Sequence, residues 1–468
     1  MLEVHEPMFT LNSPLFEGAT LFFPFGDGLI VPYEFEGVQV EAAAARTSAW
    51  IGTQLMISPV HDVKGPDAIR FLNSVCVNDF TTMTDKGVRH GLICNERGQI
   101  MSEGVVIKLA VDHYRTYWLN PPLQYLIDTS GMDVVGEDVS FQEYFIQIDG
   151  ERSLEILERA TGQDLHDIGF ARHRLAKIGD KDMRVLRLGM AGGLGYEVHG
   201  PIKDFDEVYS KIWEAGKALG AKKLGMHAYA GLNHTPGGLP NILVHYPAPL
   251  FESDEGRFSG LSEYLSTRPY EGIFQYNRRL RGSVGSDLNA RLVTPYDLGL
   301  GGLVNFAKSD NFPGRAALKE LSESPPRKIV TLEWNAEDVA AIYATQLSGR
   351  EIEPCENIAQ PTDYSYQDFI LGQGQPDKGY TYRADHVMSG GKMVGISTGR
   401  VMDYHYRRML SLAFIDAEHE ICGSELNLLW GTPGTPQREI RVKVSKFPFH
   451  DSVPNRLRDV SAIPRFGA

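Results

Sequence analysis

The stretch LRLGMAGGLGYEVHGP, from Leu186 to Pro201, places five glycines around a single carboxylate, that of Glu197. A phosphate-binding loop is excluded, because such loops carry Lys, Ser or Thr before a helix N-terminus and a carboxylate repels the ligand. Gly192, Gly193 and Gly195 favour a backbone bent through positive φ, which lets a flat group come close. An ionised carboxylate accepts two hydrogen bonds at once, so Glu197 is a candidate acceptor for the paired N–H donors of a neutral heterocycle.

A simpler interpretation of the same residues is a Gly-rich hairpin. Its strands would run over Met183–Leu188 and Tyr196–Val198, and Glu197 would stand in solvent. Glycine clusters punctuate strands in many proteins, whether or not a ligand binds at the turn. The stretch by itself leaves both interpretations open, and both predict a β-hairpin.

The composition predicts a folded protein that binds neither nucleic acid nor membrane. Its 468 residues correspond to about two to four domains, and a hydrophobic content of 42% supports a large core. The net charge of −14 opposes binding to nucleic acid or to an anionic membrane surface. No apolar run approaches the roughly 20 residues of a spanning helix, and the N-terminus lacks the pattern of a signal peptide. We therefore expect a cytoplasmic protein.

Cysteine usage predicts neither a disulfide framework nor structural zinc. Cys76, Cys94, Cys355 and Cys422 are scattered along the chain and form no CxxC pair. No other group of residues has the spacing of metal ligands, so we expect no metal site.

The hydrophobic pattern predicts an α+β region over about the first 320 residues and an all-β unit after it. Lys203–Leu219 has the clearest helical periodicity, and helices are also predicted over Pro66–Val75 and Arg152–Ala160. Two strands are predicted on either side of a turn at Asn95–Gly98. The two prolines of Ser322–Lys328 end a short helix and mark the boundary. Beyond it, a barrel-like or jelly-roll-like unit is predicted from the segments KIVTLEW, KMVGISTGR, LSLAFID, SELNLLW and REIRVKVSKF.

Several segments recur in the order typical of one family: HGLICNERGQIMSEGVVI (90–107), FIQIDGERSLEIL (145–157), AGGLGYEVHGP (191–201), and TPYDLGLGGLVNF (294–306) with DNFPGRAAL (310–318). Their combination resembles the tetrahydrofolate-dependent methyl and aminomethyl transferases related to the glycine-cleavage T-protein. The resemblance covers nearly the whole chain. It implies tetrahydrofolate as the cofactor and Glu197 as the carboxylate that binds the pterin.

A narrower resemblance is carried by VTLEWNAEDVAAIYATQL (330–347), STGRVMDYHYRRMLSLAFID (397–416) and LGMHAYAGLNHTPGGLP (224–240). These segments resemble the aryl O-demethylases that act on vanillate, syringate and 3-O-methylgallate, whose catalytic tyrosine matches Tyr229. Aminomethyltransferases typically carry an Arg-Asp pair in this region, where this chain has His227, Ala228 and Tyr229. The difference favours ether chemistry over amine chemistry.

The resemblance implies a three-domain, cloverleaf-like α+β fold with an all-β C-terminal domain. The expected boundaries are residues 1–60 together with 140–325 for a discontinuous folate-binding part, 61–139 for an inserted α+β domain, and 326–468 for the C-terminal β domain.

The resemblance also implies a set of site residues, with Tyr229 as the catalytic residue. The expected folate-binding residues are Glu197, Gln147, Tyr196 and Glu103, where the family often has Asp at the last position. The expected substrate-binding residues are Gln54, Ile57, Leu119, Asn120, His227 and Tyr33. Vanillate-type enzymes use a His and an Arg near the substrate, and by eye these fall near Ile57 and near Leu119 or Asn120. We therefore expect altered substrate recognition.

Tyrosine suits the release of a phenol. Its reference pKa of about 10 is close to that of phenols, so proton transfer to the departing oxygen is nearly balanced in energy. We expect Tyr229 to donate this proton as the methyl group of a methoxylated aromatic acid moves to N5 of tetrahydrofolate. Syringate, vanillate or a chlorinated methoxybenzoate such as dicamba would be the substrate, as in the catabolism of lignin-derived aromatics. The alternatives are an aminomethyl- or S-methyl-transferase, including the dimethylsulfoniopropionate demethylase type, and a folate-binding protein without activity.

Overall fold

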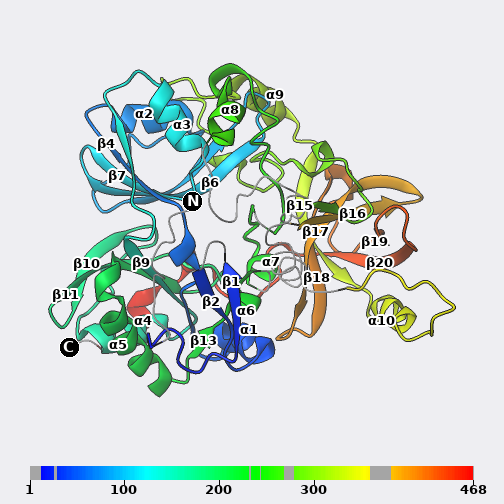
Figure 1. Ribbon diagram of the computed structural model, residues 1–468, viewed down its shortest axis with the longest axis horizontal. Helices are drawn as coiled ribbons and strands as arrows, with labels where there is room; N and C mark the ends of the chain where they lie inside the picture. Colours follow the sequence, from blue (N-terminus) through cyan, green and yellow to red (C-terminus); the bar gives the residue numbers. More distant parts are fainter. Residues whose placement is uncertain are drawn as a thin grey trace.

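Three groups of strands and helices surround the centre of the molecule (Figure 1). The computed structural model describes residues 12–25, 29–230, 233–242, 244–267, 279–358 and 381–466. One group, with β4, β6 and β7, lies at the upper left of the view, a second, with β9 to β11, at the lower left, and a third, with β15 to β20, at the right. None of the helices in the described ranges is long and apolar enough to cross a membrane.

The lower-left group is a six-stranded sheet covered by two helices. In sheet order its strands are β10 (His173–Ile178), β11 (Lys181–Leu186), β12 (Gly195–Pro201), β9 (Glu143–Asp149), β3 (Trp50–Gly52) and β13 (Lys222–Leu224). The covering helices are α4 (Ser153–Thr161) and α5 (Phe205–Ala218). The helical period of α5 places Phe205, Val208 and Ile212 against the sheet, as the sequence predicts.

Shorter elements lie near the end of this sheet that β13 forms. They are β1 (Leu21–Phe25), β2 (Leu29–Glu34), α1 (Val38–Thr47), the 3₁₀ helix η1 (Gln54–Ile57) and α6 (Met226–Ala230). The helix α1 contacts β3, β13 and α6, α6 contacts β2, and η1 contacts β9. A further short helix, α7 (His234–Gly237), contacts the strands β17 and β18 of the right-hand group.

The upper-left group is a five-stranded sheet formed by the residues between β3 and β9. In sheet order its strands are β5 (Val88–Cys94), β6 (Ile100–Ala110), β7 (His113–Tyr117), β4 (Val60–Lys64) and β8 (Val135–Asp138). Three helices accompany it: α2 (Ala68–Val75), α3 (Pro122–Thr129) and α8 (Leu261–Ser266). Since β3 and β9 pair directly, this group is an excursion from the six-stranded sheet.

The right-hand group is a closed barrel of six strands. Around the barrel these are β15 (Arg327–Trp334), β18 (Arg408–Asp416), β17 (Lys392–Asp403), β16 (Thr381–Ser389), β19 (Glu425–Trp430) and β20 (Arg438–Ser445). Pairing of β16 with β19 closes the barrel, and β14 (Arg279–Arg281) adds to β16 in parallel. The helices α9 (Arg315–Glu323) and α10 (Ala336–Thr345) precede and follow β15. The expected all-β C-terminal unit is confirmed.

We propose that the three sheets are the cores of the three expected domains, 1–60 with 140–325, 61–139 and 326–468. The segment carrying Leu250, Phe258 and Leu261 packs against the five-stranded sheet, although it lies within 140–325 in the chain.

The strand β16 escaped the sequence analysis because it is polar. Arg383 and Asp385 are both buried, and the Arg383 Nε atom lies 2.8 Å from an Asp385 carboxylate oxygen. Glu356 pairs with the same guanidinium. The charges neutralise one another inside the barrel, a compensation that a periodicity test does not detect.

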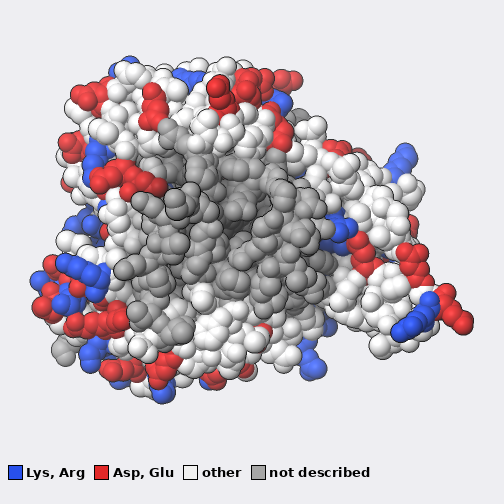
Figure 2. All heavy atoms as spheres, in the orientation of Figure 1, with Lys and Arg blue, Asp and Glu red and all other residues white. Residues whose placement is uncertain are grey.

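Acidic residues dominate the charged surface. On the face in Figure 2, Asp and Glu lie along the rim with Lys and Arg between them. Among the described residues of this face the basic side chains form no continuous patch, in keeping with the net charge of −14.

Candidate active site

Glu197 lies on the inner part of the six-stranded sheet, opposite Gln147 of β9. Because side chains alternate along a strand, Glu197 and His199 share one face of β12. Gln147 Nε2 donates to Glu197 Oε1 at 3.3 Å, and His199 Nε2 lies 3.4 Å from Glu197 Oε2. Glu197 is only 6% exposed. The predicted hairpin is confirmed, and its interpretation with a solvated Glu197 is wrong.

The environment of Glu197 is short of hydrogen-bond donors. Burial raises the pKa of Glu197 to about 7, against the lowering effect of the Gln147 amide. Within the described part of the chain, Gln147 Oε1 and Gln54 Oε1 are buried acceptors without a hydrogen-bond partner. Gln54 lies close to Gln147. Gly52 is the register partner of Gln147, and a Cβ atom on Gly52 would lie 2.6 Å from Gln54 Oε1. An unmet buried acceptor costs about 1–3 kcal/mol, so this group fits a ligand edge rich in N–H donors. A tetrahydrofolate pterin presents such an edge.

The glycines before Glu197 make room for the protein's own side chains. The Asp149 carboxylate accepts the N–H of Met190 at 3.1 Å and that of Ala191 at 3.4 Å. A Cβ atom at Gly195 would lie 2.2 Å from Asp149 Oδ1, and one at Gly189 2.3 Å from it. The expectation of positive φ is correct for Gly192, at +79°, and wrong for Gly193 and Gly195.

The hydroxyl of Tyr229 is buried beside this group. Tyr229 is 6% exposed, and its hydroxyl donates to Met190 Sδ at 2.9 Å, a weak acceptor. Burial raises its pKa well above the ordinary value, with the negative charges of Glu197 and Asp149 adding to the effect. An ordinary pKa for Tyr229, as expected from the sequence, is therefore wrong, because burial disfavours the phenolate. Tyr229 therefore keeps its proton throughout the neutral range.

A buried carboxylate fixes the start of the helix that carries Tyr229. Glu41 Oε2 accepts the N–H of Gly225 at 2.7 Å, just before α6. Glu41 Oε1 accepts three more backbone N–H groups, the nearest from Phe35 at 2.7 Å. Glu41 is fully buried, so α1, the β2 end and α6 are held as one unit.

His234 packs against Tyr229, and the charge of Glu103 acts on His234. The rings of Tyr229 and His234 meet edge to face, 5.8 Å apart at 89°. Burial lowers the pKa of His234 to about 4, and the charge of Glu103 opposes the shift. The Tyr246 hydroxyl donates to Glu103 Oε1, and His90 Nε2 lies 3.2 Å from Glu103 Oε2.

Of the expected substrate-binding residues, His227 lies on the Tyr229 helix, and Tyr33 and Gln54 lie next to it. His227 pairs with Glu34 and stacks on Tyr33, with ring centroids 4.8 Å apart at 12°. Gln54 Nε2 donates to the carbonyl of Leu224, one residue before Gly225.

The other expected residues lie elsewhere. Tyr196 faces the hydrophobic core on the opposite side of β12, and Leu119 is buried in the core of the five-stranded sheet. Asn120 Nδ2 lies against the ring of His61, 3.1 Å from Nε2. For the described residues, no hydrogen bond or ring contact joins these three to Tyr229 or Glu197. Ile57 ends η1, and its side chain lies outside the described residues.

Asp149, His199 and His234 also belong to this site, and they were not predicted from the sequence. The first two had a detectable signal, because they follow Gln147 and Glu197 by two positions on strands and so share their faces. His234 had none, since its position depends on how α7 packs against Tyr229.

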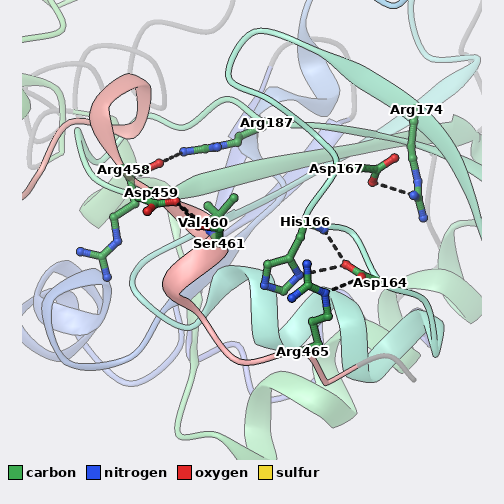
Figure 3. A pocket seen from close by; sticks show the side chains of 10 residues that line it. All are labelled: Asp164, His166, Asp167, Arg174, Arg187, Arg458, Asp459, Val460, Ser461 and Arg465. Atoms are coloured by element: carbon green, nitrogen blue, oxygen red, sulfur yellow. Dashed lines mark hydrogen bonds and ion pairs between the residues drawn. The ribbon is translucent and has the colours of Figure 1, made fainter.

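A hollow of about 500 Å³ lies near the C-terminus, lined by residues from 164–187 and from 458–465 (Figure 3). Its charged side chains pair with one another: Arg465 with Asp164 at 2.7 Å, and Arg174 with Asp167 at 2.6 Å. Glu158, Asp164 and His166 form the one metal-type cluster in the described ranges. Glu158 already accepts the backbone N–H groups of Leu165 and Phe466, at 2.7 and 2.8 Å. We interpret the cluster as an anchor for the C-terminal tail.

Comparison with known proteins identifies the family. Residues 17–234 match the model described as GCVT N-terminal domain. The chain is 46% identical to sesamin methylene transferase from Sinomonas sp., over 97% of this chain and 98% of that protein. The chain belongs to the GCVT, or T-protein, family.

Two further relatives of this T-protein family member are informative. Syringate O-demethylase from Sphingobium sp. is 26% identical, over 89% of this chain and 91% of that protein. The crystal structure of aminomethyltransferase T from Bartonella henselae matches with a TM-score of 0.62 at 16% identity, over 95% and 98% of the two chains. The expected T-protein fold is thereby confirmed. The protein is an enzyme of the tetrahydrofolate-dependent methyltransferase class, as the resemblance implied.

Proposed function

We propose that this enzyme moves a one-carbon group from a neutral aryl ether to tetrahydrofolate, and that the ether is a methylenedioxyphenyl compound of the sesamin type. The 46% identity to sesamin methylene transferase, over nearly the full length of both chains, supports this substrate class. Ile57 stands near the position where a His of the vanillate-type enzymes was expected, and it carries no charge. A substrate without a carboxylate is consistent with that exchange.

The observation that carries the proposal is the Tyr229 hydroxyl, buried next to Glu197 with a thioether as its acceptor. Its weak bond to Met190 is easily exchanged for a bond to an ether oxygen. A tyrosine with a raised pKa is a poor acid toward water. The departing phenolate is generated in the same buried environment, which disfavours its charge as well, so the proton transfer stays nearly balanced.

Glu197, Gln147 and Gln54 would hold the pterin through its N–H donors, so that Gln54 would serve the folate and not, as expected from the sequence, the substrate. When bound, tetrahydrofolate supplies the nitrogen nucleophiles that accept the one-carbon group. The protein's tasks are to align the ether with them and to protonate the leaving oxygen. A methoxyl group needs one such proton, because one C–O bond breaks. A methylenedioxy bridge needs two, because both C–O bonds break and both oxygens become phenols. The same number of protons leaves nitrogen, so neither oxidant nor reductant is required.

A second candidate is O-demethylation of a methoxylated aromatic acid, which would give a phenol and 5-methyltetrahydrofolate. The relationship to syringate O-demethylase favours it, and the same tyrosine would serve. Syringate, vanillate and dicamba are the compounds to test. Either activity would place the protein in aromatic catabolism in the cytoplasm.

One incubation distinguishes the two. Full-length protein and tetrahydrofolate are mixed with sesamin, 1,3-benzodioxole, syringate, vanillate, dicamba or 1,2-dimethoxybenzene, and folate and phenol products are followed by mass spectrometry. Catechol with methylenetetrahydrofolate from the first two compounds supports the proposal. Methyltetrahydrofolate from syringate, with no turnover of the dioxoles, replaces it by the second candidate. No folate product from any compound would contradict both.

A further inference from the structure

His234 has one ring nitrogen in use and one that is not. Nδ1 lies 2.9 Å from the carbonyl oxygen of Leu239. A carbonyl only accepts, so Nδ1 carries the proton, and in the neutral ring Nε2 is left as a lone-pair acceptor. Nε2 is buried and has no hydrogen-bond partner in the described structure, while the whole residue is only 4% exposed.

The unused nitrogen belongs to the ring that packs against the proposed acid. The ring centroids of His234 and Tyr229 are 5.8 Å apart, and the rings are perpendicular. Where these two rings meet, Tyr229 offers a hydroxyl donor and His234 offers a lone-pair acceptor. A buried acceptor that lacks a hydrogen bond is unfavourable. A ligand that supplies an O–H group beside the ether oxygen would remove this cost.

We propose that His234 Nε2 accepts a hydrogen bond from a ring hydroxyl next to the oxygen served by Tyr229. The site would then recognise vicinal aromatic oxygens, one as an ether and its neighbour as a hydroxyl. A methylenedioxy ring reaches this pattern after its first C–O bond has broken, and a 2-methoxyphenol has it from the outset. This inference rests on the proposed function, because it assumes that an aryl ether binds at Tyr229.

A neighbouring histidine makes the contrast clear. His245 is 3% exposed, and both of its nitrogens are engaged: Nδ1 accepts the N–H of Asn241 at 2.9 Å, and Nε2 lies 3.0 Å from Thr235 Oγ1. His245 is thus a buried histidine of this region with partners on both nitrogens, which makes it a matched control for His234.

The test measures the affinity of three small probes by calorimetry. The probes are catechol, 2-methoxyphenol and 1,2-dimethoxybenzene, bound to full-length protein with folic acid, whose oxidised pterin accepts no one-carbon group. The two phenols are expected to bind about tenfold more tightly than the dimethoxy compound, the ratio that one hydrogen bond supplies. The Nε2 resonance of ¹⁵N-histidine-labelled protein should shift with the phenols and not with 1,2-dimethoxybenzene.

Two variants separate recognition from packing. His234→Asn keeps a donor near the Nδ1 position and removes the Nε2 acceptor, so the tenfold preference should fall to about twofold or less. His234→Gln places an amide oxygen near Nε2 and should restore much of the preference. His245→Asn, the matched control, should lower stability and leave the preference intact.

The outcomes also separate this inference from the proposed function. If all three probes bind the wild type equally and the Nε2 resonance does not move, the role of His234 is refuted while aryl binding stands. If His234→Asn keeps the full preference, another acceptor is responsible. If no probe binds, the proposed function and the inference fall together. The NMR measurement needs no variant and remains decisive if His234→Asn does not fold.

Discussion

Replacing Glu197 by glutamine should change folate binding and stability in opposite directions. In the folded protein, burial raises the pKa of Glu197 from its ordinary value of 4.5 to about 7. The native state therefore holds a proton that the unfolded state has released, and stability falls as pH rises from about 4.5 to 7. Above pH 7 the ionised Glu197 therefore lowers the free energy of unfolding by about 3 kcal/mol. This cost is fully present at pH 8 and absent below pH 4.5. Glu197→Gln removes this cost.

The same change should weaken folate binding. An amide replaces a carboxylate that accepts charge-assisted hydrogen bonds, each worth about 1.5–3 kcal/mol, so the Kd for tetrahydrofolate should rise by roughly 10- to 150-fold. Denaturant unfolding of the ligand-free protein at pH 5 and pH 8 measures the first effect, and calorimetry with tetrahydrofolate measures the second. The stability gain should be about 3 kcal/mol at pH 8 and clearly smaller at pH 5.

Glu158→Gln is the matched control. Glu158 is fully buried on α4, which covers the same sheet, but its carboxylate is satisfied by backbone N–H groups of Leu165 and Phe466. That variant should lose stability and keep its folate affinity. The reasoning is refuted if Glu197→Gln is less stable than wild type at pH 8, or if its Kd for tetrahydrofolate is unchanged.

Three further predictions follow from the site. Tyr229→Phe should keep folate affinity but lower turnover by roughly 10²- to 10⁴-fold. The loss should be smaller for ethers of more acidic phenols, whose phenolates leave with less help. If the one-carbon transfer limits the rate and the loss is equal on chlorinated and unchlorinated ethers, Tyr229 is not the acid. Gly195→Ala should lower the free energy of unfolding by about 1–3 kcal/mol in chemical denaturation, because its Cβ would lie 2.2 Å from Asp149 Oδ1. Gly193→Ala is the control and should be tolerated, because the atom nearest to its Cβ would lie 3.3 Å away. Activity should survive exhaustive EDTA treatment, since the protein's proposed role is alignment and proton transfer; a loss that zinc, iron or cobalt restores would contradict that mechanism.

Strand and helix periodicities were readable from the sequence, because burial on one face repeats every two or 3.6 residues. The α5 helix and the hairpin around Glu197 were predicted in this way. The polar strand β16 was not, because its Arg383 and Asp385 neutralise each other only in the closed barrel.

The candidate site was only partly predictable for a related reason. Glu197, Gln147 and Tyr229 were identified from sequence, and the structure brings them to one place. The proposed roles of Tyr196, Leu119 and Asn120 do not gain such support, because alternation along β12 and packing of the five-stranded sheet direct these side chains elsewhere. Position along a chain does not specify the direction of a side chain until the pairing register is known.

The sequence by itself determined the fold class, the family resemblance and the lone carboxylate in a glycine-rich hairpin, since these depend on local pattern and on the order of motifs. Only the tertiary structure decided what the glycines accommodate and which groups are left without partners. Asp149 meets Gly195, and His234 meets Tyr229, across 46 and 5 positions of the chain respectively. Burial, which sets the pKa of Glu197 and leaves His234 Nε2 unmet, depends on every segment packed around these residues, and no single stretch of sequence contains that information.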